Sequence, residues 1–160
     1  MDRIDRILAH ALFREYLEKN RKAEKDRIFC RHEMTHFLDV ARIGRIINLE
    51  EGLGVAEELI YAAALLHDIG KHLQYSQGIP HEKAGAELAP EILRDCGFDE
   101  KETGEIAEAI MSHRTPSVSR ERGLRGILYR ADKASRLCLG CPVIAECHWE
   151  EKQKNQTLLY

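Results

Sequence analysis

Long apolar runs are missing from this 160-residue sequence, and their absence excludes one class of protein. The longest apolar stretch runs only from Leu59 to Leu66, whereas an α-helix needs about 20 apolar residues to cross a bilayer. The N-terminus alternates charged and apolar residues and therefore does not resemble a secretion signal. We expect a cytoplasmic protein with no membrane partner.

An excess of either charge is also missing. The sequence has 24 Lys and Arg against 27 Asp and Glu, which leaves a formal net charge of −3. Nucleic-acid-binding proteins usually carry a basic excess or stripe, so we expect no nucleic-acid partner. The charged run from Glu18 to Arg27 mixes both signs and is interpreted as a solvated helix end. With 44% hydrophobic residues and only 4 prolines, the composition is that of a folded globular domain.

Strand patterns, internal repeats and low-complexity tracts are absent as well. Apolar residues instead recur every three or four positions, which is the spacing of amphipathic helices. We expect an all-α fold, a compact single-domain bundle of about six helices. The predicted helices cover residues 2–18, 26–49, 55–69, 81–96, 99–113 and 119–137. Pro90 should kink or split the fourth of them.

Four polar residues fall on the apolar faces or at the tips of these predicted helices. They are His36 in the second helix, His67 and Asp68 at the end of the third, and Asp132 in the sixth. An unpaired buried carboxylate costs several kcal/mol or changes its protonation, and one shared divalent cation would satisfy all four residues. Imidazole with carboxylate suits iron, manganese, zinc or cobalt. The simpler alternatives are hydrogen-bonded core histidines and an ion pair of Asp132 with Arg136.

Three stretches carry a resemblance to a known family. Residues 63–71 read AALLHDIGK, His36 is followed by Val40 and Ala41, and residues 129–133 read YRADK. In combination they resemble the signature segments of the HD superfamily of metal-dependent phosphohydrolases, over about residues 28 to 137. The resemblance implies an all-helical fold, hydrolysis of phosphate esters or anhydrides, chiefly of nucleotides, and metal ligation by His36, His67, Asp68 and Asp132.

Two more stretches resemble the extra histidines that some HD branches use for a second metal ion. They read PHEKAGA at residues 80–86 and AIMSH at residues 109–113. One such branch is the HD-type symmetrical dinucleoside tetraphosphatases. On this interpretation His81 and His113 hold a second ion and Asp68 bridges the two. Alternatively, His81 merely begins a helix and His113 merely ends one.

Four basic residues lie within a few positions of the proposed ligands and are candidate phosphate contacts: Lys71, Arg114, Lys133 and Arg136. Lys71 is the first choice among them, although any could be an ordinary solvated side chain. The remaining histidines are interpreted as surface residues at His10, His72 and His148, with His32 as an undecided neighbour of the pocket.

The five cysteines form an odd number in a chain that shows no export signal, so we expect reduced thiols or metal ligands rather than disulfides. Cys138, Cys141 and Cys147 have the spacing C-x2-C-x5-C and need a fourth ligand. Cys30 is the natural candidate and His148 the alternative, and either zinc or an iron–sulfur cluster suits the set. Otherwise these are small apolar residues at a helix end.

The sequence thus favours a hydrolase in which metal-activated hydroxide attacks the phosphorus of a small phosphorylated substrate, with Asp68 and Lys71 as catalytic residues. One or two divalent metal ions are the only cofactors expected there. The competing hypothesis is a non-catalytic protein that senses a nucleotide, redox state or metal. We assign residues 1–25 to an N-terminal helix on the core, 26–137 to the metal-binding domain, and 138–160 to its cysteine-containing C-terminal segment.

Overall fold

The computed structural model describes residues 1–160 and contains helices but no strands. The all-α fold predicted from the sequence is confirmed, although the helices are more numerous and shorter than expected. The α-helices are α1 (Asp2–Ala9), α2 (Ala11–Ala23), α3 (Met34–Glu50), α4 (Glu57–Leu66), α5 (Lys71–Gln77), α6 (His81–Asp95), α7 (Glu100–Ser112) and α8 (Leu124–Ala134). Short 3-10 helices lie at η1 (Pro116–Arg120), η2 (Ile144–Glu146) and η3 (Glu151–Gln153).

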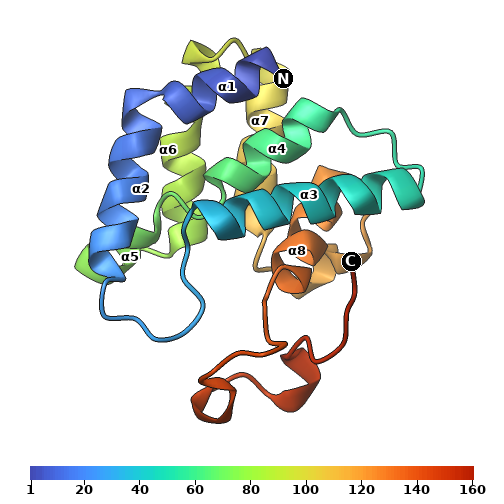
Figure 1. Ribbon diagram of the computed structural model, residues 1–160. Helices are drawn as coiled ribbons and strands as arrows, with labels where there is room; N and C mark the ends of the chain where they lie inside the picture. The colour runs from blue at the N-terminus through green and yellow to red at the C-terminus, as the bar shows by residue number, and fades with distance from the viewer.

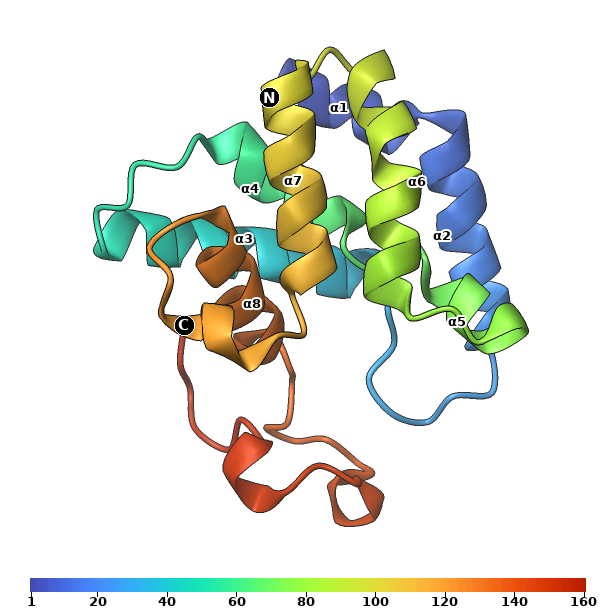
Figure 2. The same cartoon turned by 180° about the vertical axis from the view of Figure 1, so that it is seen from behind.

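The most apolar helix, α4, lies at the centre of the bundle. Its residues from Ala62 to Leu66 have no exposed surface, because α1, α3, α7 and α8 pack around it (Figures 1 and 2). Burial of apolar surface on all sides holds α4 firmly, so the residues that follow its last turn have a fixed position. No helix in the structure combines the length and the apolar character that a membrane crossing requires.

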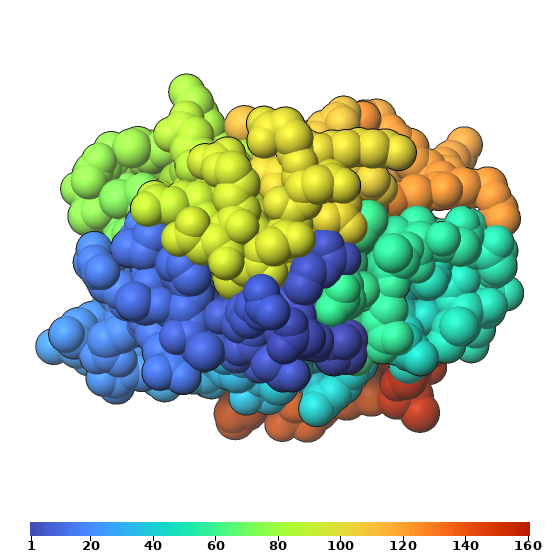
Figure 3. Space-filling view, turned by 90° about the horizontal axis from the view of Figure 1, so that it is seen from above, coloured from blue at the N-terminus to red at the C-terminus, as the bar shows by residue number.

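The N-terminal region forms two helices where the sequence predicted one over residues 2–18. The chain turns at His10, whose extended backbone separates α1 from α2 and whose Nδ1 accepts a hydrogen bond from the Leu12 N–H (3.2 Å). The turn lets Ile4 and Ile7 of α1 and Phe13 of α2 all enter the core. Figure 3 shows α1 and α2, in blue, closing one side of the bundle beside α6 and α7.

Several other predicted boundaries were wrong. Residues 26–33 form a loop, because Glu24 turns inward to bind the backbone N–H of His32 (2.8 Å). Residues 71–77 form helix α5 where a loop was expected, and only the residues around Gly78, with φ +71°, connect it to α6. Pro90 does not split α6, which continues through it, and Ala89 and Ile92 beside it are fully buried in the core.

The last predicted helix, over residues 119–137, is shorter at both ends in the structure. Residues 116–120 form η1, and α8 begins only at Leu124 and ends at Ala134. The polar tail after Cys147 returns to the end of α8. The Asn155 amide donates to the carbonyls of Lys133 (2.9 Å), Ala134 (3.0 Å) and Arg136 (3.0 Å). These bonds satisfy carbonyls that have no partner within α8.

Arg3 joins α1 to two other helices. Its Nε donates to Glu58 of α4 (2.7 Å), its guanidinium donates to Glu102 of α7 (2.6 Å), and it lies 4.1 Å from the Phe98 ring centroid. The hydrogen bonds from Arg3 lower the pKa of both glutamates. The ion pairs therefore stabilise the fold at pH values above the ordinary glutamate pKa. This contribution is lost as the pH falls through the lowered pKa values of the two glutamates.

We predict that Arg3→Met lowers the free energy of unfolding by about 1–2 kcal/mol at neutral pH, because the two charged hydrogen bonds are lost. Arg6→Met is the matched control, since Arg6 pairs only with exposed Asp2 within α1, and it should cost less than about 0.5 kcal/mol. Urea unfolding at neutral and acidic pH measures both. Equal effects of the two substitutions, or an Arg3 effect that persists in acid, would contradict this account.

Candidate metal centre

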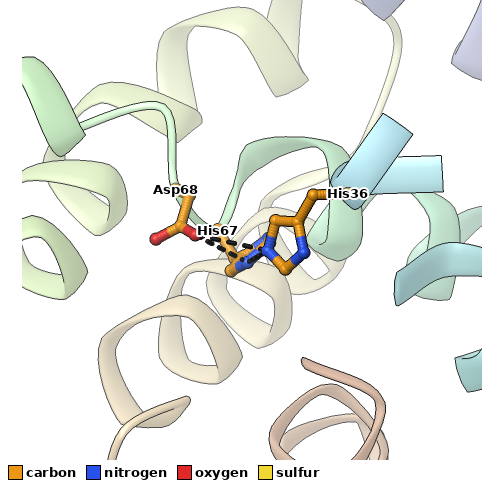
Figure 4. Close-up of side chains that lie close together, drawn as sticks. All are labelled: His36, His67 and Asp68. Atoms are coloured by element: carbon orange, nitrogen blue, oxygen red, sulfur yellow. Dashed lines mark hydrogen bonds and ion pairs between the residues drawn. The ribbon is translucent and has the colours of Figure 1, made fainter. Parts of the chain in front are cut away.

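The centre is built where α4 ends. After Leu66 the chain makes a tight turn through residues 67–70, and this turn presents His67 and Asp68 on the side of α3 and α8. Helix α3 brings His36 from its first turn, and α8 brings Asp132 from near its end. Figure 4 shows the side chains of His36, His67 and Asp68 pointing toward one another.

The first group of donor atoms comes from the four residues with the family signature. His67 Nε2 lies 3.1 Å from Asp68 Oδ2, 3.2 Å from His36 Nε2 and 3.8 Å from Asp132 Oδ1. His36 Nε2 lies 3.5 Å from Asp68 Oδ2 and 3.6 Å from Asp132 Oδ1. Two atoms that each bind one ion at about 2.1 Å are roughly 3.0–3.4 Å apart. The group is therefore close to the spacing of a metal site.

A second group lies on the other side of the same carboxylate. Asp68 Oδ1 is 3.1 Å from Nε2 of His81, the first residue of α6, and 3.8 Å from Nε2 of His113, which follows α7. The two Nε2 atoms of His81 and His113 are 3.2 Å apart. Asp68 thus directs one oxygen toward each pair of histidines, and each side offers three ligand atoms within 4.8 Å of one another.

One oxygen of this carboxylate has no hydrogen-bond partner. Asp68 is only 2% exposed, and its Oδ1 accepts no hydrogen bond from any protein group. A buried charged oxygen without a donor costs several kcal/mol, whereas a divalent cation between it and two imidazoles satisfies it fully. The residues present therefore fit a bound metal ion.

Hydrogen bonds hold the imidazoles with Nε2 toward the centre. His67 Nδ1 donates to the Ala64 carbonyl and His113 Nδ1 to the Ile110 carbonyl, both at 2.7 Å. His36 Nδ1 contacts Ser135 Oγ at 3.3 Å, and His81 Nδ1 contacts the Gln74 side chain. Because each Nδ1 has its own partner, each Nε2 remains free to bind a metal, as in histidine-rich metal sites generally.

Burial sets the charge of the second pair. It lowers the pKa of His81 to about 3 and that of His113 to about 4, so both rings are neutral and each keeps a lone pair. For His67 the effect of burial is outweighed by the charge of Asp68, and its pKa is raised. Burial alone would raise the pKa of both Asp68 and Asp132. The charge of His67 outweighs burial at Asp68 and lowers its pKa. At Asp132 the charges of Lys133 and then His67 do the same. Both carboxyl groups are therefore ionised.

Several supporting residues could not be recognised from the sequence. Asn20 is fully buried, donates to the Asp68 carbonyl (2.9 Å) and accepts from the His72 N–H (2.8 Å). Glu24, 3% exposed, binds the His32 ring and accepts from Tyr75 Oη (2.7 Å), and its contacts with His32 overcome burial to lower its pKa to about 2. Both lie in the charged run that was interpreted as solvated. The only sequence feature that could have singled them out is their four-residue spacing at the end of α2.

His32 and His72 have more definite places than the sequence indicated. His32 lies at the edge of the centre, with Nε2 3.8 Å from Asp68 Oδ2. His72, expected on the surface, is half-buried, and its Nδ1 lies 3.0 Å from the Ile69 carbonyl. His10 is partly buried and His148 is exposed.

A cavity of about 630 Å³ opens over the centre. All four basic residues predicted as phosphate contacts line it, together with Arg27 and Arg31. Lys71 is buried, and its Nζ lies 3.1 Å from His81 Nδ1, so it contacts a proposed ligand as well as the cavity. Among the four predicted contacts, Arg114 is the most exposed, with 54% of its side chain accessible. Lys133 pairs with Asp132, and Arg136, the alternative partner expected for Asp132, stacks on Trp149 instead.

Comparison with known proteins agrees with this geometry. The HD domain family model matches residues 34–138. A protein of uncharacterized function from Clostridium beijerinckii is 47% identical over 160 residues, the full length of both chains. The crystal structure of a predicted HD superfamily hydrolase from an uncultured Thermotogales bacterium superimposes with a TM-score of 0.61, at 32% identity over 89% of this chain and 81% of that one.

Two longer proteins are also similar. Ribonuclease Y from Sulfurovum sp. is 32% identical over 62% of this chain, and ribonuclease Y from Acetivibrio thermocellus is 31% identical over 65%. The matched part is only 21% and 18% of those proteins, respectively. The likeness therefore concerns one segment of each ribonuclease.

Gly70 lets the turn that carries Asp68 touch α6. A Cβ at this position would lie 2.6 Å from the Gly85 nitrogen and 2.9 Å from the His81 carbonyl oxygen. We predict that Gly70→Ala pushes α6 away, lowers the free energy of unfolding by about 2–3 kcal/mol, and weakens metal binding at His81. Thermal unfolding and metal titration measure these effects.

Gly104→Ala is the matched control, since Gly104 is exposed on α7 and a Cβ added there would meet no atom within 4 Å. It should stabilise the protein by about 0.5–1 kcal/mol, because alanine favours helix. Wild-type stability and metal affinity in Gly70→Ala would show that the close contact is unimportant.

Proposed function

This chain belongs to the HD domain family, and on that premise we propose that it hydrolyses a phosphate ester or anhydride in a nucleotide, using two divalent metal ions. The observation that carries the proposal is the position of Asp68, whose two oxygens face different pairs of histidines. The first ion would be held by His36, His67, Asp68 and Asp132. The second would be held by Asp68, His81 and His113. Bound there, such ions supply Lewis acidity and activate water near neutral pH.

The chain's own residues supply positive charge around the reacting phosphate. Arg114 is exposed at the cavity and free to reach a phosphoryl oxygen, while its guanidinium lies 3.6 Å from Glu82. Lys71 is buried beside Asp68, and burial lowers its pKa, although the nearby carboxylates oppose this. A fixed cation in a desolvated position neutralises charge that develops on phosphoryl oxygens more strongly than a solvated one. Lys71 and Arg114 are therefore the proposed phosphate contacts.

The cavity favours a small substrate with more than a single phosphate. Its volume of about 630 Å³ lies within the range of small-molecule sites. Phe29 in its wall offers an aromatic ring for a base, and Arg27, Arg31 and Arg136 line the cavity beyond the ligand groups. This combination supports a nucleotide or dinucleotide rather than a simple phosphomonoester. The metal identity that we propose is iron or manganese, which mixed imidazole and carboxylate ligands accommodate.

We predict that the metal-loaded protein releases phosphate or a nucleotide from at least one compound in a panel of mononucleotides, dinucleoside polyphosphates, phosphomonoesters and short RNA. A chelator should abolish the reaction, and manganese or ferrous iron should restore it. The assay should be run without oxygen, because ferrous sites are lost in air. If fully loaded protein turned over nothing in this panel, a sensing role for the same pocket would replace hydrolysis.

Metal content separates the roles of individual residues. Asp68→Ala should lose both ions and lower turnover by at least about 100-fold, because it removes the shared ligand. His81→Ala or His113→Ala should lower the ion content of this centre from two toward one. Arg114→Gln is the control, which should keep both ions while KM rises about tenfold, since it lacks only a substrate contact.

Elemental analysis of each variant at equal protein concentration makes the comparison. Two ions retained in Asp68→Ala would refute the centre as described. An unchanged content in both histidine variants would restrict it to a single ion.

A further inference from the structure

Four of the five cysteines gather outside the metal centre. Cys30 comes from the loop before α3, and Cys138, Cys141 and Cys147 come from the segment after α8, more than one hundred positions later. All four line one small, mostly apolar cavity of about 30 Å³. All are free thiols, and the fifth, Cys96, is buried separately in the core. Figures 1 and 2 show the loop and the C-terminal segment projecting from the same side of the bundle.

The backbone around Cys138 and Cys141 has the form of a tight turn. The Cys141 N–H donates to the Cys138 carbonyl (3.2 Å), and Gly140 between them has φ +70°, which favours glycine. A second turn follows, in which the Cys147 N–H donates to the Ile144 carbonyl (3.3 Å). Thiols separated by two residues on such a turn have the spacing found in structural zinc sites.

One contact that involves no sulfur joins the loop to the C-terminal segment, and further contacts order each of them. The Phe29 ring packs edge-on against the His148 ring, with centroids 5.8 Å apart, and Arg136 stacks on Trp149 at 3.9 Å. On the loop side, Arg27 Nε donates to the Cys30 carbonyl (2.7 Å). His148 is engaged with Phe29 and Trp149 and does not line the thiol cavity, so Cys30 is the better fourth ligand.

The surroundings suit a negatively charged group. Four thiolates around a divalent ion carry a net charge of −2, and three basic residues, Arg27, Arg136 and Lys154, line the cavity. The Lys154 side chain is only 7% exposed, and its Nζ donates to the Ile144 carbonyl (3.3 Å).

We propose that Cys30, Cys138, Cys141 and Cys147 hold a single zinc ion as four thiolates, and that this ion fastens the C-terminal segment to the loop before α3. Each thiol gives up one proton to solvent when the ion binds, and nothing is oxidised or reduced. Unlike the ligand atoms at Asp68, the four sulfurs are not within 4.8 Å of one another. Binding therefore includes their closure onto the cavity.

The zinc site would also shape the proposed substrate cavity. Cys141, Pro142, Val143 and Trp149 line that cavity as well, and they lie in the segment that the ion would fasten. Loss of zinc should free this wall and raise KM with little change in kcat. This consequence rests on the proposed hydrolase function, whereas zinc binding itself does not.

The test counts zinc in the full-length protein, purified with reductant and without chelator. In the Asp68→Ala background, which empties the histidine centre, we expect one zinc per chain. Adding Cys138→Ser and Cys141→Ser should remove it, while adding Cys96→Ser, the matched control outside the cluster, should not. Alkylation should spare the four cluster thiols until zinc is chelated, and then modify them.

Cobalt substitution gives a second measure that needs no Asp68 variant. Wild-type protein loaded with cobalt should show a thiolate-to-cobalt charge-transfer absorption, which histidine and carboxylate ligands do not produce, and the double serine variant should lose it. Cluster thiols that react freely in native protein without zinc would overturn the proposal. Disulfides among them, or acid-labile sulfide from an iron–sulfur cluster, would overturn it equally. None of these outcomes depends on turnover.

Discussion

The buried carboxylate of Asp68 is the constraint on which the rest of the structure depends. A charged group with 2% exposure is unstable in a protein interior unless cations or donors surround it. Here histidines approach from both sides, and one oxygen is left without any donor. The bundle thus concentrates negative charge at one point where metal ions would compensate it. The proposed chemistry follows from that arrangement.

The surrounding helices are placed so that this carboxylate is held from several directions. Full burial of the end of α4 fixes the backbone before it, and Asn20 of α2 binds its carbonyl. Gly70 permits α6 to come within contact distance, which brings His81 to the second oxygen. The contact between Glu24 and His32 holds the charged loop after α2 against the bundle. Cys30 of this loop lines the cysteine cavity. The two candidate metal sites therefore share one wall.

The helical class and the resemblance carried by His36, His67, Asp68 and Asp132 were readable from sequence, because apolar periodicity and short motifs are local signals. Asn20 and Glu24 were not, since a charged run such as residues 18–27 looks solvated until tertiary contacts bury part of it. The break at His10 and the continuity of α6 through Pro90 likewise depend on packing rather than on local propensity. The roles of His36, His67, Asp68 and Asp132 as metal ligands remain predictions.

Anomalous diffraction from crystals of metal-loaded protein tests the central claim most directly, because it locates each ion and identifies its element. The account predicts two peaks flanking the Asp68 carboxylate, one among His36, His67 and Asp132 and the other between His81 and His113. Each should lie about 2.0–2.3 Å from an Asp68 oxygen. Crystals of loaded protein with no peak within ligand distance of Asp68, or with its Oδ1 hydrogen-bonded to a protein donor instead, would contradict it.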